Sequence, residues 1–166
     1  MAAAVSTTPV LQGTGRTPDR PGSVGFEPVV HLMDLPRHGA GNVADFACVA
    51  GLTRPWRRML ISSSGEAGAF RPRATLDRPA TIGRLASSLN GGVSGRFDRS
   101  RTLEVELFFG SLAAAAPLSV LDGENRLALR ARSGAWEVIG FAGAEEISAG
   151  RWRLSSLLRG LVGTED

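Results

Sequence analysis

The sequence contains no lysine and no tyrosine, and it has one cysteine and two histidines among 166 residues. A single cysteine excludes an internal disulfide and a zinc site built from several cysteines. This residue, Cys48, lies in the apolar run 46–50, where a free cysteine is usually a small buried hydrophobic side chain. Two histidines do not complete a zinc site unless carboxylates join them.

The charge of the chain is unusual in kind. All 19 basic residues are arginines, and 16 acidic residues bring the net charge down to +3. The arginines are scattered, and only residues 151–153 interleave them tightly with an aromatic side chain. Nucleic-acid surfaces combine a basic stripe with aromatic residues between the charges. We therefore expect no nucleic-acid partner.

The chain also lacks the features of a secretion signal and of a membrane span. Residues 1–10 have neither a basic start nor a continuous apolar core, as a signal peptide would. The longest apolar stretch, residues 107–121, is interrupted by Gly110 and Pro117 and is shorter than the roughly 20 residues that a membrane helix needs. We expect no signal peptide and no membrane span.

The order of elements predicts one β-rich domain. Residues 1–23 are rich in Ala, Thr, Pro, Gly and Arg, which predicts a flexible leader, and a single domain is expected over residues 24–166. Within Thr102–Phe109, apolar and acidic residues alternate, which is typical of a half-buried strand. By similar patterns, strands are predicted at residues 26–35, 59–61, 127–129 and 136–141.

One helix is predicted near the C-terminus. Leu154, Leu157, Leu158 and Leu161 follow the i, i+3, i+4, i+7 spacing of an amphipathic helix. The expected fold class is therefore mainly β, an antiparallel sheet or sandwich-like module with one short C-terminal amphipathic helix.

Candidate catalytic and metal-binding residues do not form a convincing site. His31 and Asp34 fall on opposite faces of a strand because their spacing is odd, and His38 lies in the following loop. Two histidines at the surface or in a loop are the simpler interpretation. The Gly-x-Gly-x-x-Ala spacing at residues 39–44 lacks the strand and helix of a dinucleotide fold.

Nucleophiles and paired carboxylates are equally unpromising. No serine stands in a Gly-x-Ser-x-Gly turn. Glu145 and Glu146 are neighbours, so on a strand they point to opposite faces. We predict a protein that is not an enzyme and has no catalytic, cofactor-binding or metal-binding residues, and therefore no cofactor.

The last third of the chain carries a resemblance. Its segments are Leu121–Ala128, Gly134–Phe141, Gly150–Ser155 and Leu157–Glu165. In this order they resemble the C-terminal part of the large tail-tip or baseplate hub protein, the "host specificity" protein, of gene transfer agents and related siphophages. The resemblance covers residues 55–166. Gly140 and Leu161 stand where the family usually has glutamine.

The resemblance implies a structural role. It implies a component of a phage-like tail tip or baseplate that acts by assembly and by host-surface recognition. Its partners would be other tail proteins, further copies in a ring, and a host-surface polysaccharide. Its location would be the particle tail, after assembly in the cytoplasm. Family members are far longer, so we expect a short product or a fragment of a hub protein.

The residues expected to mediate packing or assembly are Trp136, Leu154, Leu157, Leu158 and Arg159. Arg159 has two interpretations: it pairs with a carboxylate of a neighbouring subunit, or it is a solvated cation at a helix end. The alternative function is a carbohydrate-binding or carbohydrate-active β module, in which Trp56, Trp136 and Trp152 would stack on sugars.

Overall fold

The computed structural model describes residues 26–35, 47–66, 68–131 and 133–164. The predicted leader, residues 1–23, and His38 lie outside these residues. The described residues are mainly β, with antiparallel sheets and one short α-helix, so the predicted fold class is confirmed. The strands are β1 (Phe26–Asp34), β2 (Ala47–Arg54), β3 (Met59–Ser63), β4 (Arg71–Leu76), β5 (Ile82–Leu85), β6 (Phe97–Phe109), β7 (Arg126–Arg130), β8 (Trp136–Ser148) and β9 (Arg151–Leu158).

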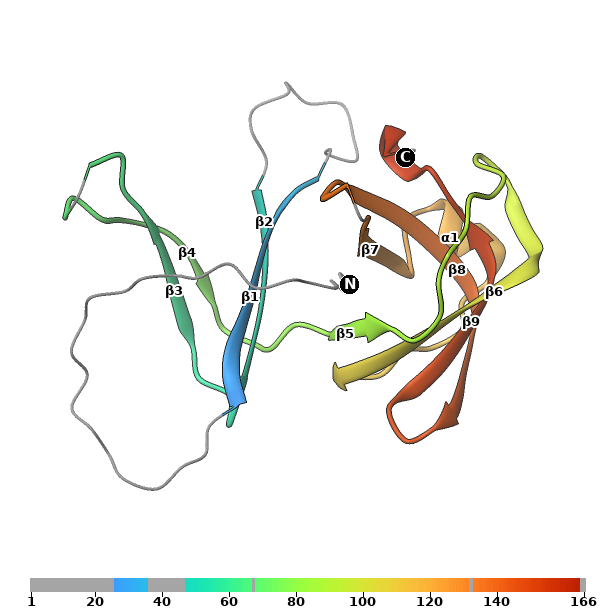
Figure 1. The fold of residues 1–166 in the computed structure, drawn as a ribbon, viewed down its shortest axis with the longest axis horizontal. Helices are drawn as coiled ribbons and strands as arrows, with labels where there is room; N and C mark the ends of the chain where they lie inside the picture. The colour runs from blue at the N-terminus through green and yellow to red at the C-terminus, as the bar shows by residue number, and fades with distance from the viewer. Residues whose placement is uncertain (1–25, 36–46, 67, 132, 165–166) are drawn as a thin grey trace.

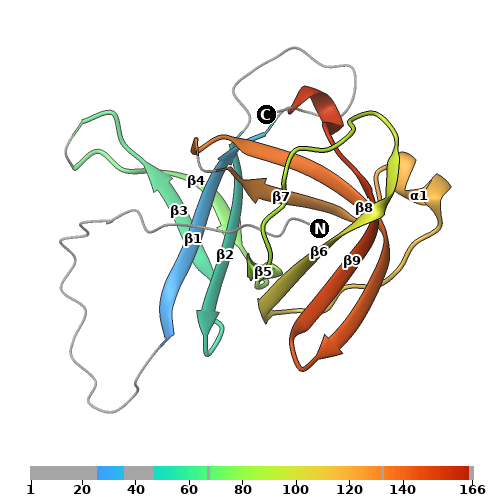
Figure 2. The same ribbon diagram turned by 45° about the vertical axis from the view of Figure 1, so that its right-hand side comes forward.

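Five strands form one antiparallel sheet in the order β5-β6-β9-β8-β7. The sheet curls into a half-barrel, with β5 and β7 as its edge strands (Figures 1 and 2). Its main core combines aliphatic side chains from β6 to β9 with Phe141 of β8. In β6 the predicted alternation is confirmed, because Leu103 and Val105 are buried in this core while the side chain of Glu104 bonds arginines of β9.

A second, smaller cluster covers the other face of the sheet. The helix α1 (Pro117–Leu121) begins with a proline. Proline suits the first turn of a helix because backbone N–H groups there have no partner within the helix, so the N–H that proline lacks costs no hydrogen bond. Val120 of α1 is fully buried against Ala142 and Leu158. The first half of β8 is therefore buried on both faces, which explains why the run from Glu137 to Ala142 is buried without alternation.

The prediction of a helix at residues 154–161 is wrong, because most of this segment belongs to a strand. Residues 151–158 form strand β9, which lies between β6 and β8, and a short 3-10 turn, η1 (Leu161–Gly163), follows it. Ser156 has a φ of 52°, and this left-handed residue interrupts the alternation of the strand. Leu154 and Leu157 consequently face the main core, while Leu158 faces α1. A strand with one irregular residue thus reproduces a helical leucine spacing.

The remaining described strands form two hairpins outside the sheet. In the first, β1 pairs with β2, and its buried residues Met33, Ala50 and Leu52 pack with Ile82 of β5 and Ala128 of β7. In the second, β3 pairs with β4, and this ribbon projects away from the five-stranded sheet in both views (Figures 1 and 2). Among the described residues, none of the helices has the length and apolar character required to cross a membrane.

Candidate functional site

The sheet places an arginine and a glutamate side by side at the end of β9. Arg159 follows the last residue of β9, and Glu137 is the second residue of β8. Leu158 pairs with Gly140, so extending the register by one residue puts Arg159 opposite Ile139. Side chains two residues apart on a strand share a face, which brings Glu137 diagonally next to Arg159.

The two side chains form a two-point ion pair. Arg159 Nε donates to Glu137 Oε1 at 2.7 Å, and Arg159 Nη2 donates to Oε2 at 2.6 Å. Both side chains are largely buried, with 11% of Arg159 and 9% of Glu137 exposed. The hydrogen bonds to Glu137 raise the pKa of Arg159, and they outweigh burial, which acts in the opposite direction. Parallel hydrogen bonds of this kind are stronger than neutral ones.

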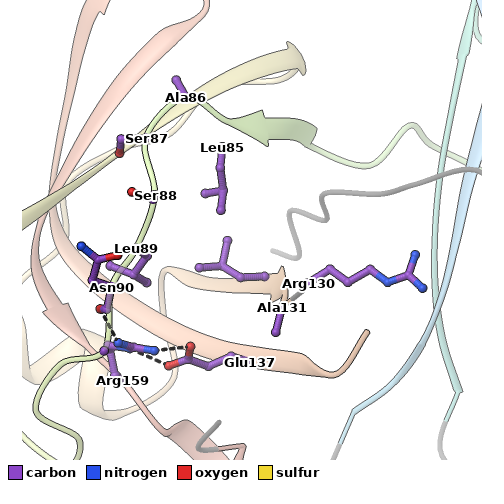
Figure 3. Close-up of a pocket in the computed structure, with 12 residues that line it drawn as sticks. Leu85, Ala86, Ser87, Ser88, Leu89, Asn90, Arg130, Ala131, Glu137 and Arg159 are labelled. Atoms are coloured by element: carbon purple, nitrogen blue, oxygen red, sulfur yellow. Dashed lines mark hydrogen bonds and ion pairs between the residues drawn. The ribbon is translucent and has the colours of Figure 1, made fainter. Parts of the chain in front are cut away.

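Arg159 also fastens the loop that leads from β5 to β6. Its Nη1 donates to the carbonyl of Asn90 at 2.9 Å (Figure 3). Its own carbonyl accepts from Gly95 N at 3.4 Å. Nearer β5, Ala86 N donates to the carbonyl of Glu104 at 2.8 Å. The loop is therefore held at both ends on the five-stranded sheet.

A groove of about 770 Å³ lies between this loop and the end of edge strand β7. Leucines and the ion pair share its wall (Figure 3), whose residues are Leu85, Ala86, Ser87, Ser88, Leu89, Asn90, Gly91, Leu129, Arg130, Ala131, Glu137 and Arg159. Two charged groups in the wall, Arg159 and Glu137, bond each other. Ser87 Oγ accepts a hydrogen bond from Glu104 N at 3.0 Å. Among the lining residues, neither serine has a histidine in the same wall, and the carboxylate of Glu137 is bound to Arg159.

Trp136 joins the sheet to the first hairpin. Its ring packs against the cluster of Met33 and Leu52, and it meets the His31 ring edge-on at 6.1 Å between centroids. The guanidinium carbon of Arg130 lies 6.0 Å from the Trp136 ring. The prediction of a surface or loop position is wrong for His31, which is 4% exposed on the inner face of β1. Burial, aided by the charge of Arg130, lowers the pKa of His31.

A known family of proteins matches the part of the chain that forms the half-barrel. A family model described as "Rcc01698-like, C-terminal" matches residues 80–166, which is more than half of the chain. The chain belongs to this family. Among curated proteins, the search found no match. The Rcc01698-like segment contains the five-stranded sheet, α1 and the Arg159–Glu137 pair, whereas both hairpins precede it.

The Rcc01698-like segment holds all five predicted packing residues, and the structure separates them. Leu154 and Leu157 lie in the main core, Leu158 packs against α1, and Trp136 packs against the first hairpin. Arg159 is not a solvated cation, because its side chain is 11% exposed and bound to Glu137 of its own chain. It follows strand β9 and not the end of the predicted helix. Its role in assembly stays a prediction.

Sequence reasoning missed Glu137, the partner of Arg159. The available signal was a lone acid inside the apolar run Trp136–Phe141, since a buried carboxylate requires a partner. The part of the chain that the structure describes contains no group of three or more His, Cys, Asp or Glu side chains that could hold a metal ion. The predicted lack of catalysis stays a prediction.

Proposed function

We propose that this chain is a structural component of the tail tip or baseplate of a phage-like particle, of the hub-protein kind. It would act by assembly and binding, without turnover. The observation that carries this proposal is membership of the Rcc01698-like family, which is linked to a gene-transfer-agent protein. The matched segment is the part of the chain that contains the half-barrel.

The architecture is compatible with a rigid structural protein that contacts other subunits. The run from Glu137 to Ala142 in β8 is buried on both faces, and cross-strand ion pairs join β5, β6 and β9 on the sheet surface. Several large apolar side chains remain exposed, among them Leu118 of α1 with 73% of its surface accessible. Exposed apolar residues that gather into a patch mark contact surfaces. These features support contacts with other tail proteins and with further copies in a ring, and a location in the particle tail.

The carbohydrate alternative receives no support from the tryptophans. Trp136 and Trp152 are only half-exposed and pack against two separate clusters. Trp56 is also half-buried. Sugar-binding surfaces use exposed aromatic rings that a ligand can reach. We therefore give the assembly function precedence and keep polysaccharide recognition as a property of the assembled tail.

The experiment is to locate the chain in particles. An epitope tag on the chain, in cells that release particles, should appear in density-gradient fractions with capsid protein, and gold-labelled antibody should mark the tail end. A tagged unrelated protein of equal size is the control. Tag that stays in particle-free fractions at all stages of particle release would overturn the proposal.

A further inference from the structure

The positive charge of the chain is concentrated on the second hairpin. We call residues 54–78, which contain β3 and β4, the arginine ribbon. The ribbon carries a net charge of +4, because it contains six arginines and two acidic residues, Glu66 and Asp77. The arginines are Arg54, Arg57, Arg58, Arg71, Arg73 and Arg78. The whole chain carries +3, which leaves −1 for all other residues together.

Several arginines of the five-stranded sheet form ion pairs with acids of the same sheet, whereas, among the described residues, most of the ribbon arginines form none. On the sheet, Arg84 pairs with Glu106 at 2.7 Å and Arg151 pairs with Glu104 at 2.6 Å. On the ribbon, Arg58 pairs with Asp77 at 2.8 Å. Within the described part of the chain, four ribbon arginines form no ion pair with a carboxylate: Arg57, Arg71, Arg73 and Arg78.

The ribbon is also poorly packed. All residues of β4 except the last are exposed, and apolar side chains stand open on the ribbon, with Leu60 61% and Phe70 69% accessible. The end of the ribbon at Met59 and Leu76 is anchored, because these side chains lie so close to Gly51 of β2 that a Cβ there would clash with both. Two-stranded ribbons are marginally stable in water without a further strand or a covering layer.

We propose that the arginine ribbon is a docking surface for an acidic, extended segment of another protein, which adds a third strand to it. This inference does not rest on the tail-tip function. Unpaired arginines supply the charge complementarity, the open strand edge supplies main-chain hydrogen bonds, and Leu60 receives apolar side chains of the incoming strand. A protein strand satisfies all three features at once.

The incoming strand pairs with β3. In the described residues, β3 and β4 pair with each other and with no further strand, so each has one open edge. Pro72 of β4 has no N–H to donate, which weakens the edge of β4 as a template. The residues of β3, Met59–Ser63, include no proline. Arg57 and Arg58 directly precede β3, whereas Arg71 and Arg73 lie on β4, across β3 from the incoming segment, and act on it through their charge.

A nucleic acid fits this surface less well. Single-stranded nucleic acids bind where successive aromatic rings stack on the bases. Phe70 is the one large exposed aromatic side chain that the described part of the ribbon offers. The aliphatic Leu60 and the open main-chain edge have no use in such a complex.

Binding of a designed peptide to the full chain tests this proposal. The probe is a labelled peptide, Thr-Glu-Val-Glu-Val-Glu-Thr with blocked ends, and its counterpart has lysine in place of each glutamate. We expect the acidic peptide alone to bind, with amide shifts at Leu60–Ser63 in NMR spectra and with an affinity that falls as salt rises. Equal binding of the lysine peptide would overturn the proposal.

Three double substitutions locate the binding, of which the two to glutamate change the net charge equally. The variant Arg71→Glu/Arg73→Glu should weaken acidic-peptide binding at least tenfold, and the milder Arg71→Gln/Arg73→Gln should weaken it less. The control Arg96→Glu/Arg99→Glu changes two exposed arginines outside the ribbon and should alter binding less than twofold. Thermal melts verify that each variant folds.

Three results would contradict the assignment. The first is an equal loss of binding in the control variant. The second is tighter binding of a ten-nucleotide oligo-dT than of the acidic peptide, lost in the ribbon variant. The third is self-association through the ribbon, seen by sedimentation, in a chain that ignores the acidic peptide.

Discussion

Arg159 and Glu137 are separated by 22 residues in the chain and share two hydrogen bonds of 2.7 and 2.6 Å. The pair connects the end of β9 to the start of β8, and through Asn90 it also holds the loop between β5 and β6. Three separate stretches of the Rcc01698-like segment therefore depend on one guanidinium. Because this group is buried, its loss leaves a carboxylate without compensation.

Removal of the guanidinium should cost much more stability than removal of an exposed arginine. We expect Arg159→Ala to lower the free energy of unfolding by about 3 kcal/mol, since Glu137 then stays buried and unpaired. Urea denaturation at neutral pH measures this difference. The control, Arg96→Ala, removes an exposed arginine and should stay within about 0.5 kcal/mol.

Replacement of both partners separates the loss of the pair from the loss of packing. Arg159→Met/Glu137→Leu should regain most of the stability that Arg159→Ala loses, because no buried charge remains. A loss under 1 kcal/mol for Arg159→Ala would show that Glu137 is hydrated and that the loop is held by other contacts.

The leucine that faces α1 should be as important as those in the main core. Leu158 is 3% exposed and packs with Val120 and Ala142. Leu158→Ala should therefore destabilise the chain by about 2–5 kcal/mol through lost burial and a cavity. Leu118→Ala, on the solvent side of the same helix, should have an effect below about 0.5 kcal/mol. An unchanged melting temperature for Leu158→Ala would mean that α1 is not docked on β9.

The sequence predicts the strands well where one face of a strand is buried and the other is solvated. Strand β6 is such a case, since Leu103 and Val105 face the core and Glu104 does not. The prediction fails at β9, because alternation assumes regular backbone and Ser156 adopts a positive φ. Nothing in the local pattern distinguishes that irregular strand from an amphipathic helix.

The ion pair could not be predicted because it depends on register. Glu137 and Arg159 become neighbours only when β8 and β9 pair with Leu158 opposite Gly140. A shift of one residue would send one of the two side chains to the opposite face of the sheet. The burial of His31 has a similar origin, since it depends on how the first hairpin packs against Trp136.

The buried histidine should make stability depend on pH in the mildly acidic range. Burial and Arg130 lower the pKa of His31 below its ordinary 6.5, so in this range the unfolded chain binds more protons at this site than the folded chain. Stability therefore rises with pH there, and it should fall as the pH drops from 7.5 to 5.5. His31→Phe keeps an aromatic ring beside Trp136 and removes the titration.

Urea denaturation of both proteins at the two pH values checks this. The wild-type chain should lose more stability between pH 7.5 and 5.5 than His31→Phe does. Equal losses would assign the pH dependence to other groups. Glu104 and Asp98 do not interfere, because their pKa values are lowered from the acidic values usual for carboxyl groups, by hydrogen bonds to arginines and to Ser100 respectively.

Gly140 should be intolerant of any side chain, although it lies in a regular part of β8. A Cβ at this position would lie 2.8 Å from Val120 Cγ1 and 3.4 Å from Leu161 Cδ1. Valine has a stiff side chain, so α1 must move to admit even a methyl group. We expect Gly140→Ala to cost about 1–3 kcal/mol, and a glutamine here would displace α1 further.

A double-mutant cycle with Val120 tests the reason for this intolerance. Val120→Ala removes the atom that a Cβ would strike, so Gly140→Ala should cost less in that background than in the wild-type chain. Gly65→Ala is the control, because its added Cβ would meet nothing within 4 Å, and its effect should be neutral. Additive costs in the cycle would show that the penalty arises in the strand itself and not in the contact between α1 and the sheet.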